Sequence, residues 1–213
     1  MRITFYLFAF VFFALFVACE PAAENTSEEA TTETTDESAT SDTTEPTEEA
    51  VEVAAPSGEN YSTQIIEQDI PSPRKEMTGT LGDVNVTVNY GSPSVRGRTI
   101  WGDLEPYDEV WRTGANKATT IEFSKGVKIE GKDLAAGKYA LFTIPKEGDW
   151  TVIFSSKPDQ FGDYNYDEAD DALRVEVSPM TLSESVEQME FVLDGNKVVF
   201  HWDTIGVGFS VEG

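Results

Sequence analysis

The feature that most constrains the fold of this chain is an alternation of apolar and polar residues with a period of two. Successive side chains of a β-strand point to opposite faces, so such a run predicts a strand with one buried face. No long run with the 3.6-residue period of an amphipathic helix accompanies these segments, and an all-β fold is therefore expected. The clearest run places valine and tyrosine on one face and polar residues on the other: Val84, Val86, Val88 and Tyr90 against Asn85, Thr87 and Asn89.

Turn-forming residues divide the alternating runs into short strands. Gly82 and Asp83 interrupt the segment Lys75–Tyr90, which predicts a β-hairpin, and the sequence LDGNK at 193–197 predicts a second tight turn. About nine or ten short strands at near-even spacing predict an antiparallel β-sandwich, either immunoglobulin-like or jelly-roll-like. Beyond the first hairpin, strands are expected at Thr119–Phe123, Val127–Ile129, Lys138–Ile144, Trp150–Phe154, Leu173–Val177, Val186–Leu193, Lys197–Trp202 and Ile205–Val211.

Residues 1–18 have the layout of a secretory signal peptide, with Arg2 followed by an apolar run. The run has about fifteen residues, fewer than the ~20 that span a bilayer as a helix. Residues 15–18, with the sequence LFVA, precede Cys19 and resemble a bacterial lipobox, although Phe16 stands where leucine is usual. The resemblance implies cleavage before Cys19 and lipidation of its thiol. An ordinary signal peptide with an incidental cysteine and a permanent membrane helix are the alternatives.

A lipidated Cys19 predicts a protein anchored in a Gram-negative cell envelope, because two or more acyl chains hold a protein stably on a membrane. The outer membrane is favoured, with the rest of the chain either periplasmic or surface-exposed.

Residues 20–60 contain thirteen Asp or Glu and thirteen Ser or Thr, with no Lys, Arg or aromatic residue. Such a composition cannot bury enough apolar surface to fold, so residues 19–60 are predicted to form a disordered acidic tether.

Residues 61–213 hold all four tryptophans and have the length of one domain with a single hydrophobic core. The formal net charge of the whole chain is −24, and the acidic excess is divided between residues 1–60 and residues 61–213. Nucleic-acid binding depends on basic residues that neutralise phosphates. We therefore expect no nucleic-acid partner. Separately, we expect the protein to be a monomer.

One strand contains a segment typical of a structural corner. The sequence AGKYAL at 136–141 resembles the Ala-Gly-x-Tyr-x-Leu signature of immunoglobulin-like envelope domains. The resemblance implies that Tyr139 caps a corner, with its hydroxyl bonded to the backbone and its ring in the core.

Five motifs in the domain are long enough to be specific. They are PSVRGRTIWG at 93–102, VWRTGAN at 110–116, LFTIP at 141–145, WTVIF at 150–154 and YNYD at 164–167. Together they resemble a family catalogued as domain of unknown function 2911, envelope proteins common in Bacteroidota. The resemblance covers roughly Pro71–Val211 and implies secreted or lipid-anchored proteins. It carries no established activity and no site residue to this chain.

The segment Gly91–Lys117 lacks a strand or helix period yet is rich in aromatic and basic residues. Ordered loops of this length are usually functional. Guanidinium groups bind carboxylates and aromatic faces stack on sugars, so the loop is a candidate site for a small polar ligand, a glycan or a partner protein. Alternatively, its Trp rings close one end of the sandwich and Arg112 pairs with Asp103 or Asp108. The candidate binding residues are Arg98, Trp101, Tyr107, Trp111, Arg112 and Asn116, together with His201.

His201 is the only histidine and lies in a predicted strand. It is a possible general base beside Asp203, but a strand-face histidine with a satisfied hydrogen bond is the preferred interpretation.

The acidic segment at 163–167 presents oxygen atoms at alternate positions, as at the start of a calcium loop, although Glu168 stands where such a loop needs glycine. A solvated loop with a short helical turn over 167–172 is the alternative. The weak calcium candidates are Asp163, Asn165 and Asp167, and no other cofactor is expected.

The leading functional hypothesis is a lipid-tethered, non-enzymatic β-sandwich that binds its ligand through the segment 91–117. A hydrolase acting on envelope carbohydrate through two carboxylates is a second hypothesis, and a purely structural envelope protein is a third. The sequence contains no serine-nucleophile elbow, phosphate loop, zinc signature or metalloprotease helix. We therefore do not expect an enzyme, although carboxylates brought together by the fold leave that question open.

Overall fold

The computed structural model of the chain describes Gly58 and residues 60–213. The predicted signal peptide, Cys19 and almost all of the predicted tether lie outside the described residues, so those expectations stay predictions. Among the residues that are described, no helix has both the length and the apolar character needed to cross a membrane.

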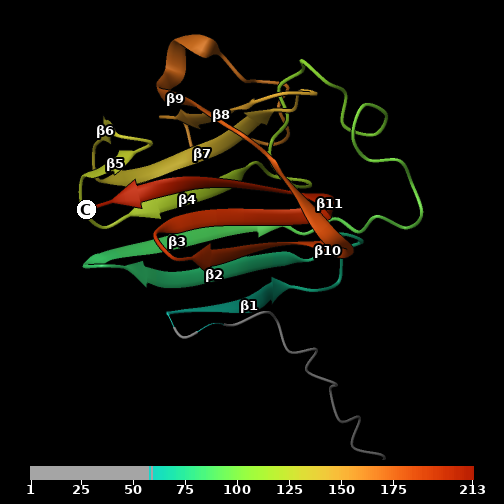
Figure 1. The fold of residues 1–213 in the computed structure, drawn as a ribbon, viewed down its shortest axis with the longest axis horizontal. Helices are drawn as coiled ribbons and strands as arrows, with labels where there is room; N and C mark the ends of the chain where they lie inside the picture. The colour runs from blue at the N-terminus through green and yellow to red at the C-terminus, as the bar shows by residue number, and fades with distance from the viewer. Residues whose placement is uncertain (1–57, 59) are drawn as a thin grey trace, which may run out of the picture. The chain divides into compact units, whose positions relative to one another are not determined.

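Within the described residues, eleven strands form two antiparallel sheets, which confirms the predicted all-β sandwich (Figure 1). One sheet has seven strands in the order β1-β2-β3-β4-β7-β8-β9, and the other has four in the order β10-β11-β5-β6. The strands are β1 (Tyr61–Glu67), β2 (Arg74–Leu81), β3 (Val84–Gly91), β4 (Thr119–Phe123), β5 (Val127–Ile129), β6 (Lys132–Leu134), β7 (Gly137–Ile144), β8 (Trp150–Ser155), β9 (Asp171–Val177), β10 (Met180–Asp194) and β11 (Lys197–Glu212).

The main core lies between the two sheets, as the period-two pattern requires. The apolar face of β3 is buried, and its polar face points away from the other sheet. Tyr90 of β3 meets Phe191 of β10 edge to face, with ring centroids 4.8 Å apart. The backbone N–H of Phe191 also donates to the Tyr90 hydroxyl oxygen at 3.3 Å, so this buried hydroxyl has a partner.

Both predicted hairpins are confirmed. Leu81 pairs with Val84 across Gly82-Asp83, and Asp194 pairs with Lys197 across Gly195-Asn196. Gly82 and Gly195 have φ values of 60° and 58°, the left-handed region that glycine enters without a steric penalty.

The structure differs from the predicted strands at three places. β1 and β6 were not expected, because β1 is a half-buried edge strand and β6 has three residues, too few to show a period. β10 begins at Met180, six residues before the predicted start at Val186. The predicted break between Lys197–Trp202 and Ile205–Val211 falls inside one strand, β11, which bends there instead of ending. Asp203 has a φ of 52° and bends the strand, which turns back so that Val211 donates to the carbonyl of Asn196 at 2.8 Å.

Tyr139 in β7 has the role that the signature implied. Its hydroxyl donates to the carbonyl oxygen of Ala135 at 2.9 Å, and its ring meets Phe154 with centroids 6.4 Å apart. The predicted helical turn is also present as a short 3-10 turn, η1 (Glu168–Asp170).

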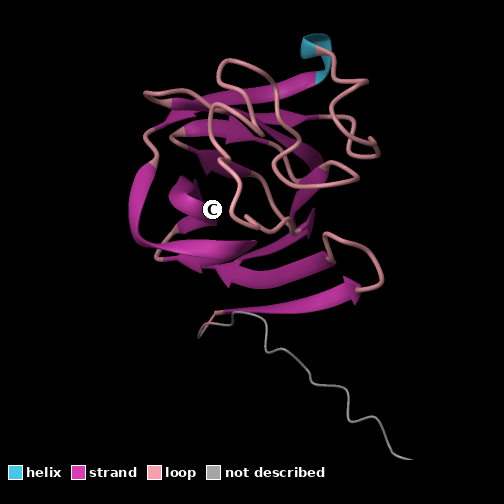
Figure 2. Cartoon of the chain, turned by 90° about the vertical axis from the view of Figure 1, so that its right-hand side faces the viewer, coloured by secondary structure: helices cyan, strands magenta, loops and turns pink. Residues whose placement is uncertain are grey.

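The long loops gather at one end of the sandwich (Figure 2). The segment 92–118 is one of them, and as predicted it contains no strand of its own. A second, smaller core lies on the outer face of the seven-stranded sheet, the face turned away from β10 and β11. It is formed by Ala118, Ala140, Phe142 and Ile153, with Tyr166 of the loop between β8 and β9 packed against them.

Candidate functional site

The tryptophans of the predicted binding loop belong to the protein core. Trp111 is 2% exposed, and Trp101 lies over it with ring centroids 5.6 Å apart. Trp111 also stacks on Trp202 of β11 at 5.7 Å, and Trp101 contacts Trp150 of β8 at 4.8 Å. The four indoles therefore form one cluster between the sheets, the arrangement expected if the rings close an end of the sandwich.

The other candidates in the loop hold its backbone in place. Arg98 donates from Nε to the carbonyl of Val95 at 3.0 Å and from Nη2 to that of Ser94 at 2.6 Å. Asn116 donates to the carbonyl of Ser72 at 3.4 Å. The ring of Tyr107 packs over Gly102, where an added Cβ would come within 2.8 Å of it.

Arg112 pairs with neither Asp103 nor Asp108. Its Nη1 lies 3.8 Å from Oδ2 of Asp163, in the loop between β8 and β9. That acid is 51 positions further along the chain, so local sequence could not indicate the pair. Burial raises the pKa of the neighbouring Glu105 to about 7, with Arg112 and Arg98 opposing the rise and Asp163 adding to it.

The three weak calcium candidates do not share one site. Asp163 faces Arg112, and Asp167 accepts a hydrogen bond from the backbone of Ala169 at 2.9 Å as the cap of η1. Asn165 is exposed. No group of three or more His, Cys, Asp or Glu side chains within the described part of the chain is arranged to hold a metal ion.

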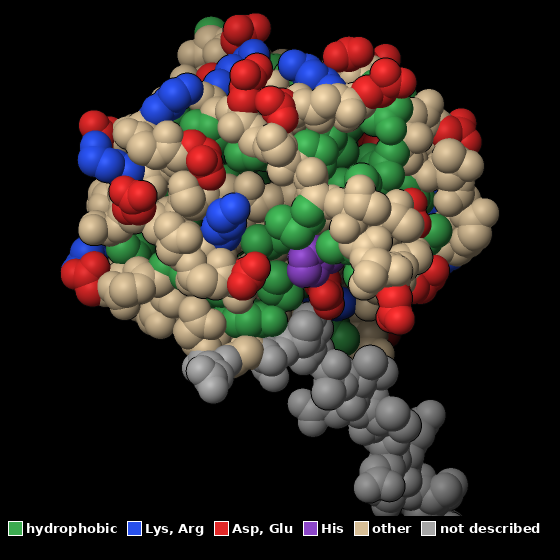
Figure 3. All heavy atoms as spheres, in the orientation of Figure 1, with side chains coloured by type: hydrophobic (Ala, Val, Ile, Leu, Met, Phe, Trp, Pro, Cys, Tyr) green, Lys and Arg blue, Asp and Glu red, His purple; other side chains and the backbone are tan. Residues whose placement is uncertain are grey.

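His201 lies in β11, with its Nδ1 3.5 Å from Oε1 of Glu190 on the paired strand β10. Asp203, the partner considered from the sequence, instead accepts a hydrogen bond from Ser185 at 3.0 Å. Figure 3 shows this single histidine at the surface, among apolar side chains and next to acidic ones. Arg98, Arg112, Asn116 and His201 thus share no partner, and none of them lines the pocket on the outer face of the sheet.

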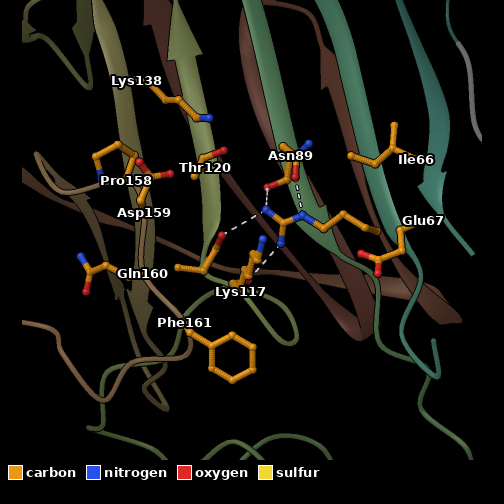
Figure 4. Close-up of a pocket in the computed structure, with 12 residues that line it drawn as sticks. Ile66, Glu67, Asn89, Lys117, Thr120, Lys138, Pro158, Asp159, Gln160 and Phe161 are labelled. Atoms are coloured by element: carbon orange, nitrogen blue, oxygen red, sulfur yellow. Dashed lines mark hydrogen bonds between the residues drawn. The ribbon is translucent and has the colours of Figure 1, made fainter. Parts of the chain in front are cut away.

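A pocket of about 610 Å³ lies on the outer face of the seven-stranded sheet (Figure 4). We call it the outer-face pocket. Four of its lining side chains come from outward-facing positions of neighbouring strands, and two come from the loops beside them. They are Arg74 of β2, Asn89 of β3, Thr120 of β4 and Lys138 of β7, with Lys117 and Phe161.

Arg74 holds the floor of the outer-face pocket together. Its Nη2 donates to the carbonyls of Asn89 and Ala118, at 3.1 and 3.3 Å, and its Nη1 donates to the carbonyl of Lys117 at 3.0 Å. Its Nε also donates to the side-chain oxygen of Asn89. Burial lowers the pKa of this guanidinium, with Glu67 opposing the change. The planar fork of arginine is what allows one side chain to bridge β2, β3 and the start of β4.

A strained turn delivers Lys117 to the pocket. Thr113 and Asn116 have φ values of 51° and 64°, and for a β-branched residue such as threonine this is an unfavourable conformation. The turn packs so closely on β3 that a Cβ at Gly91 would lie 2.1 Å from the carbonyl oxygen of Ala115. Backbone strain of this kind is concentrated at functional sites.

The loop that carries Phe161 is paired with the same turn. Ala118 donates its backbone N–H to the carbonyl of Gln160 at 3.0 Å, and Gly162 donates to that of Asn116 at 3.0 Å. These bonds leave the Phe161 ring at the rim, where the residue is 61% exposed. The exposed ring is therefore the part of the pocket lining that a flat apolar group of a solute can contact.

The lining of the outer-face pocket is slightly positive, whereas the chain as a whole is strongly negative. Its lining contains three basic residues and two acidic ones, Glu67 and Asp159. Within the described residues, neither Lys117 nor Lys138 makes an ion pair or a side-chain hydrogen bond. The arrangement therefore offers two ammonium groups, an aromatic ring and several hydroxyl, amide and carboxylate oxygens to a solute.

Sequence reasoning identified only the edge of this site. Lys117 was the last residue of the candidate loop, and the period-two pattern had already placed Asn89 on the outward face of its strand. Arg74, Lys138 and Phe161 carried no signal beyond being polar or exposed, because only the sheet order brings them together.

Comparison with known proteins identifies the family of the chain. The sequence profile of the family described as "Protein of unknown function (DUF2911)" matches residues 72–211. No curated protein and no solved structure matches the chain. The match spans nearly the whole sandwich and confirms the resemblance found in the sequence motifs. This chain therefore belongs to the DUF2911 family.

Proposed function

We propose that this chain is a lipid-anchored envelope protein whose β-sandwich binds a small polar ligand in the outer-face pocket without transforming it. The observation that carries the proposal is a pair of lysines, Lys117 and Lys138, that have no side-chain partner among the described residues and lie beside the exposed ring of Phe161. A pocket of about 610 Å³ is within the range of small-molecule sites in proteins. Of the loop 91–117, only the end at Lys117 belongs to the proposed binding surface, and the aromatic part of the loop does not.

Two carboxylates in the pocket bear on the alternative of a hydrolase. Glu67 and Asp159 both line it, but Figure 4 places them on opposite sides of the pocket, with Asn89 and Thr120 between them. A glycosidase needs its two carboxyl groups to face the same bond, with a separation of about 5 to 10 Å. The arrangement favours binding over hydrolysis.

Saturation-transfer NMR on the full-length chain in detergent tests the proposal. The panel of solutes contains sugar acids (glucuronate and galacturonate), neutral sugars (glucose and galactose), succinate and glycine. We expect at least one class to receive saturation from the protein, and the double variant Lys117→Glu, Lys138→Glu to abolish that transfer. The matched control Lys128→Glu, Lys197→Glu changes two exposed lysines outside the pocket and should leave it unchanged. Binding that survives the pocket variant, or no binding by any class, overturns the proposal.

A further inference from the structure

We infer that the outer-face pocket recognises a sugar acid, a pyranose ring that carries a carboxylate. This inference rests on the proposed function and names the chemical class of its ligand. Three properties of the pocket lead to it: the balance of its charges, the position of its aromatic ring and the kind of polar atoms that line its floor.

The charge balance favours a ligand with a single negative charge. The lining carries Arg74, Lys117 and Lys138 against Glu67 and Asp159, an excess of one positive charge in a chain whose net charge is −24. A carboxylate neutralises that excess, whereas a phosphate monoester brings close to two negative charges at neutral pH. Arg74 has already committed most of its donors to backbone carbonyls, so the two lysines are the groups able to bind the anion.

The aromatic ring favours a ligand with a flat apolar face. Phe161 is 61% exposed and borders the pocket at its rim, and Ile66, which is 47% exposed, lies on the opposite side (Figure 4). The C–H groups on one face of a pyranose stack on an aromatic ring, which removes apolar surface of both partners from water. A small inorganic anion has no such face, and neither has glycine.

The polar atoms of the lining favour a ligand with several hydroxyl groups. Asp159, Glu67 and Thr120 present oxygens that accept hydrogen bonds. The side-chain amides of Asn89 and Gln160 are already bonded, to Arg74 and to the carbonyl of Lys157, and so help to fix the lining in place. Acidic side chains beside two lysines are unsuited to a purely anionic ligand, because they repel it. They are suited to sugar hydroxyls, which donate to carboxylates while the carboxylate of the sugar meets the lysines.

Isothermal titration of the full-length chain in detergent with galacturonate, galactose and lactate tests the inference. We expect galacturonate to bind at least about tenfold more tightly than the neutral sugar, because only it pairs with the lysines. Lactate, which carries the same single charge but lacks a ring, should bind at least about tenfold more weakly as well. Raising the salt concentration should weaken the binding of galacturonate, since the two lysines are exposed.

Single substitutions test which side chains of the pocket bind the sugar acid. Lys117→Gln, Lys138→Gln and Phe161→Ala should each raise the Kd for galacturonate about tenfold. The controls are Lys197→Gln, an exposed lysine of the β10–β11 hairpin, and Tyr164→Ala, an aromatic residue that is 83% exposed and does not line the pocket. Both controls should leave the Kd unchanged. All five side chains are exposed, so unfolding curves of the variants should match that of the parent chain.

The outcomes separate this inference from the proposed function. Equal affinity for galacturonate and galactose, or lactate binding as tightly as the sugar acid, overturns the sugar-acid inference. An unchanged Kd in the lysine variants does the same. If another solute of the NMR panel still binds in a manner that depends on Lys117 and Lys138, the proposed function stands while the inference fails. If no solute binds, both fail.

Discussion

The Nη1 of Arg74 donates a hydrogen bond to the backbone carbonyl of Lys117 at 3.0 Å, and so ties β2 to the segment that leads into β4. The two residues are 43 positions apart in the chain. The same guanidinium also reaches the carbonyls of Asn89 and Ala118. Lys117, one of the two lysines on which the proposed binding depends, is therefore held in position by a side chain of β2.

Replacing Arg74 by lysine should lower the free energy of unfolding by about 2 to 3 kcal/mol, because an ammonium group cannot bridge three carbonyls and leaves some of them unsatisfied. Guanidinium chloride unfolding followed by tryptophan fluorescence measures the change. The control Arg96→Lys affects an exposed arginine that reaches one carbonyl, that of Pro71, and should cost less than about 0.5 kcal/mol. Equal effects of the two substitutions would contradict the bridging role.

Replacing Gly91 by alanine should destabilise the domain by about 3 kcal/mol, because the new Cβ would lie 2.1 Å from the backbone oxygen of Ala115. The turn that carries Thr113 and Asn116 must then move away from β3. Gly148→Ala is the matched control, since nothing lies within 4 Å of its added Cβ and its φ is not in the left-handed region. Thermal unfolding of both variants checks the prediction, and equal melting temperatures are the result that would refute it.

Replacing Trp111 by alanine should lower the free energy of unfolding by about 3 to 5 kcal/mol, because it opens a large cavity beside the rings of Trp101, Phe200 and Trp202. This expectation differs from that for a ligand-contacting tryptophan, whose loss weakens binding and leaves stability intact. Trp111→Phe should cost less. Unfolding curves that overlap those of the parent chain would return Trp111 to the list of binding residues.

Replacing Tyr139 by phenylalanine should lower the free energy of unfolding by about 1 kcal/mol, because the carbonyl of Ala135 loses its 2.9 Å hydrogen bond. Tyr107→Phe is the control, since the hydroxyl of Tyr107 bonds to no other residue that the structure describes. Chemical denaturation measures both variants. A loss of the same size at the two positions would argue against a corner bond at Tyr139.

Glu105 should make the stability of the domain depend on pH. Burial raises its folded pKa to about 7, above its ordinary value of 4.5, so between these values the folded state binds more protons than the unfolded state. The stabilisation is complete below pH 4.5 and is lost as the pH rises through about 7. Because Glu105 is only partly buried, the loss amounts to roughly 2 kcal/mol.

Chemical denaturation at pH 5 and pH 8 isolates this contribution when the parent chain is compared with Glu105→Gln. The glutamine variant lacks the titrating group, so relative to the parent it should gain stability as the pH rises. Other groups titrate in both proteins and cancel in the comparison. Identical pH dependence in the two proteins would show that Glu105 titrates normally.

Local chemistry in the sequence was enough to predict most of the strands and both hairpins, and a resemblance to a known signature indicated the corner tyrosine. Alternation in Val84–Tyr90 specifies which side chains enter the core, because the pleat sends neighbouring residues to opposite faces. Glycine at 82 and 195 specifies the tight turns, because both positions have positive φ. The signature around Tyr139 correctly indicated its bond to Ala135. These features depend on residues a few positions apart.

The candidate site was decided by the tertiary structure, because its parts are distant in sequence and meet only through the order of the strands. The aromatic content of the loop 91–117 suggested a binding surface, yet Trp101 and Trp111 pack against Trp150 and Trp202 of both sheets. Burying large apolar rings stabilises the folded domain, and that gain outweighs any local tendency to expose them. The polar end of the same loop is then left on the outer face, where the pairing of β2, β3, β4 and β7 brings Arg74, Lys117 and Lys138 to one pocket. Composition indicates which side chains are available to such a site, but which of them share it depends on pairings that span tens of residues.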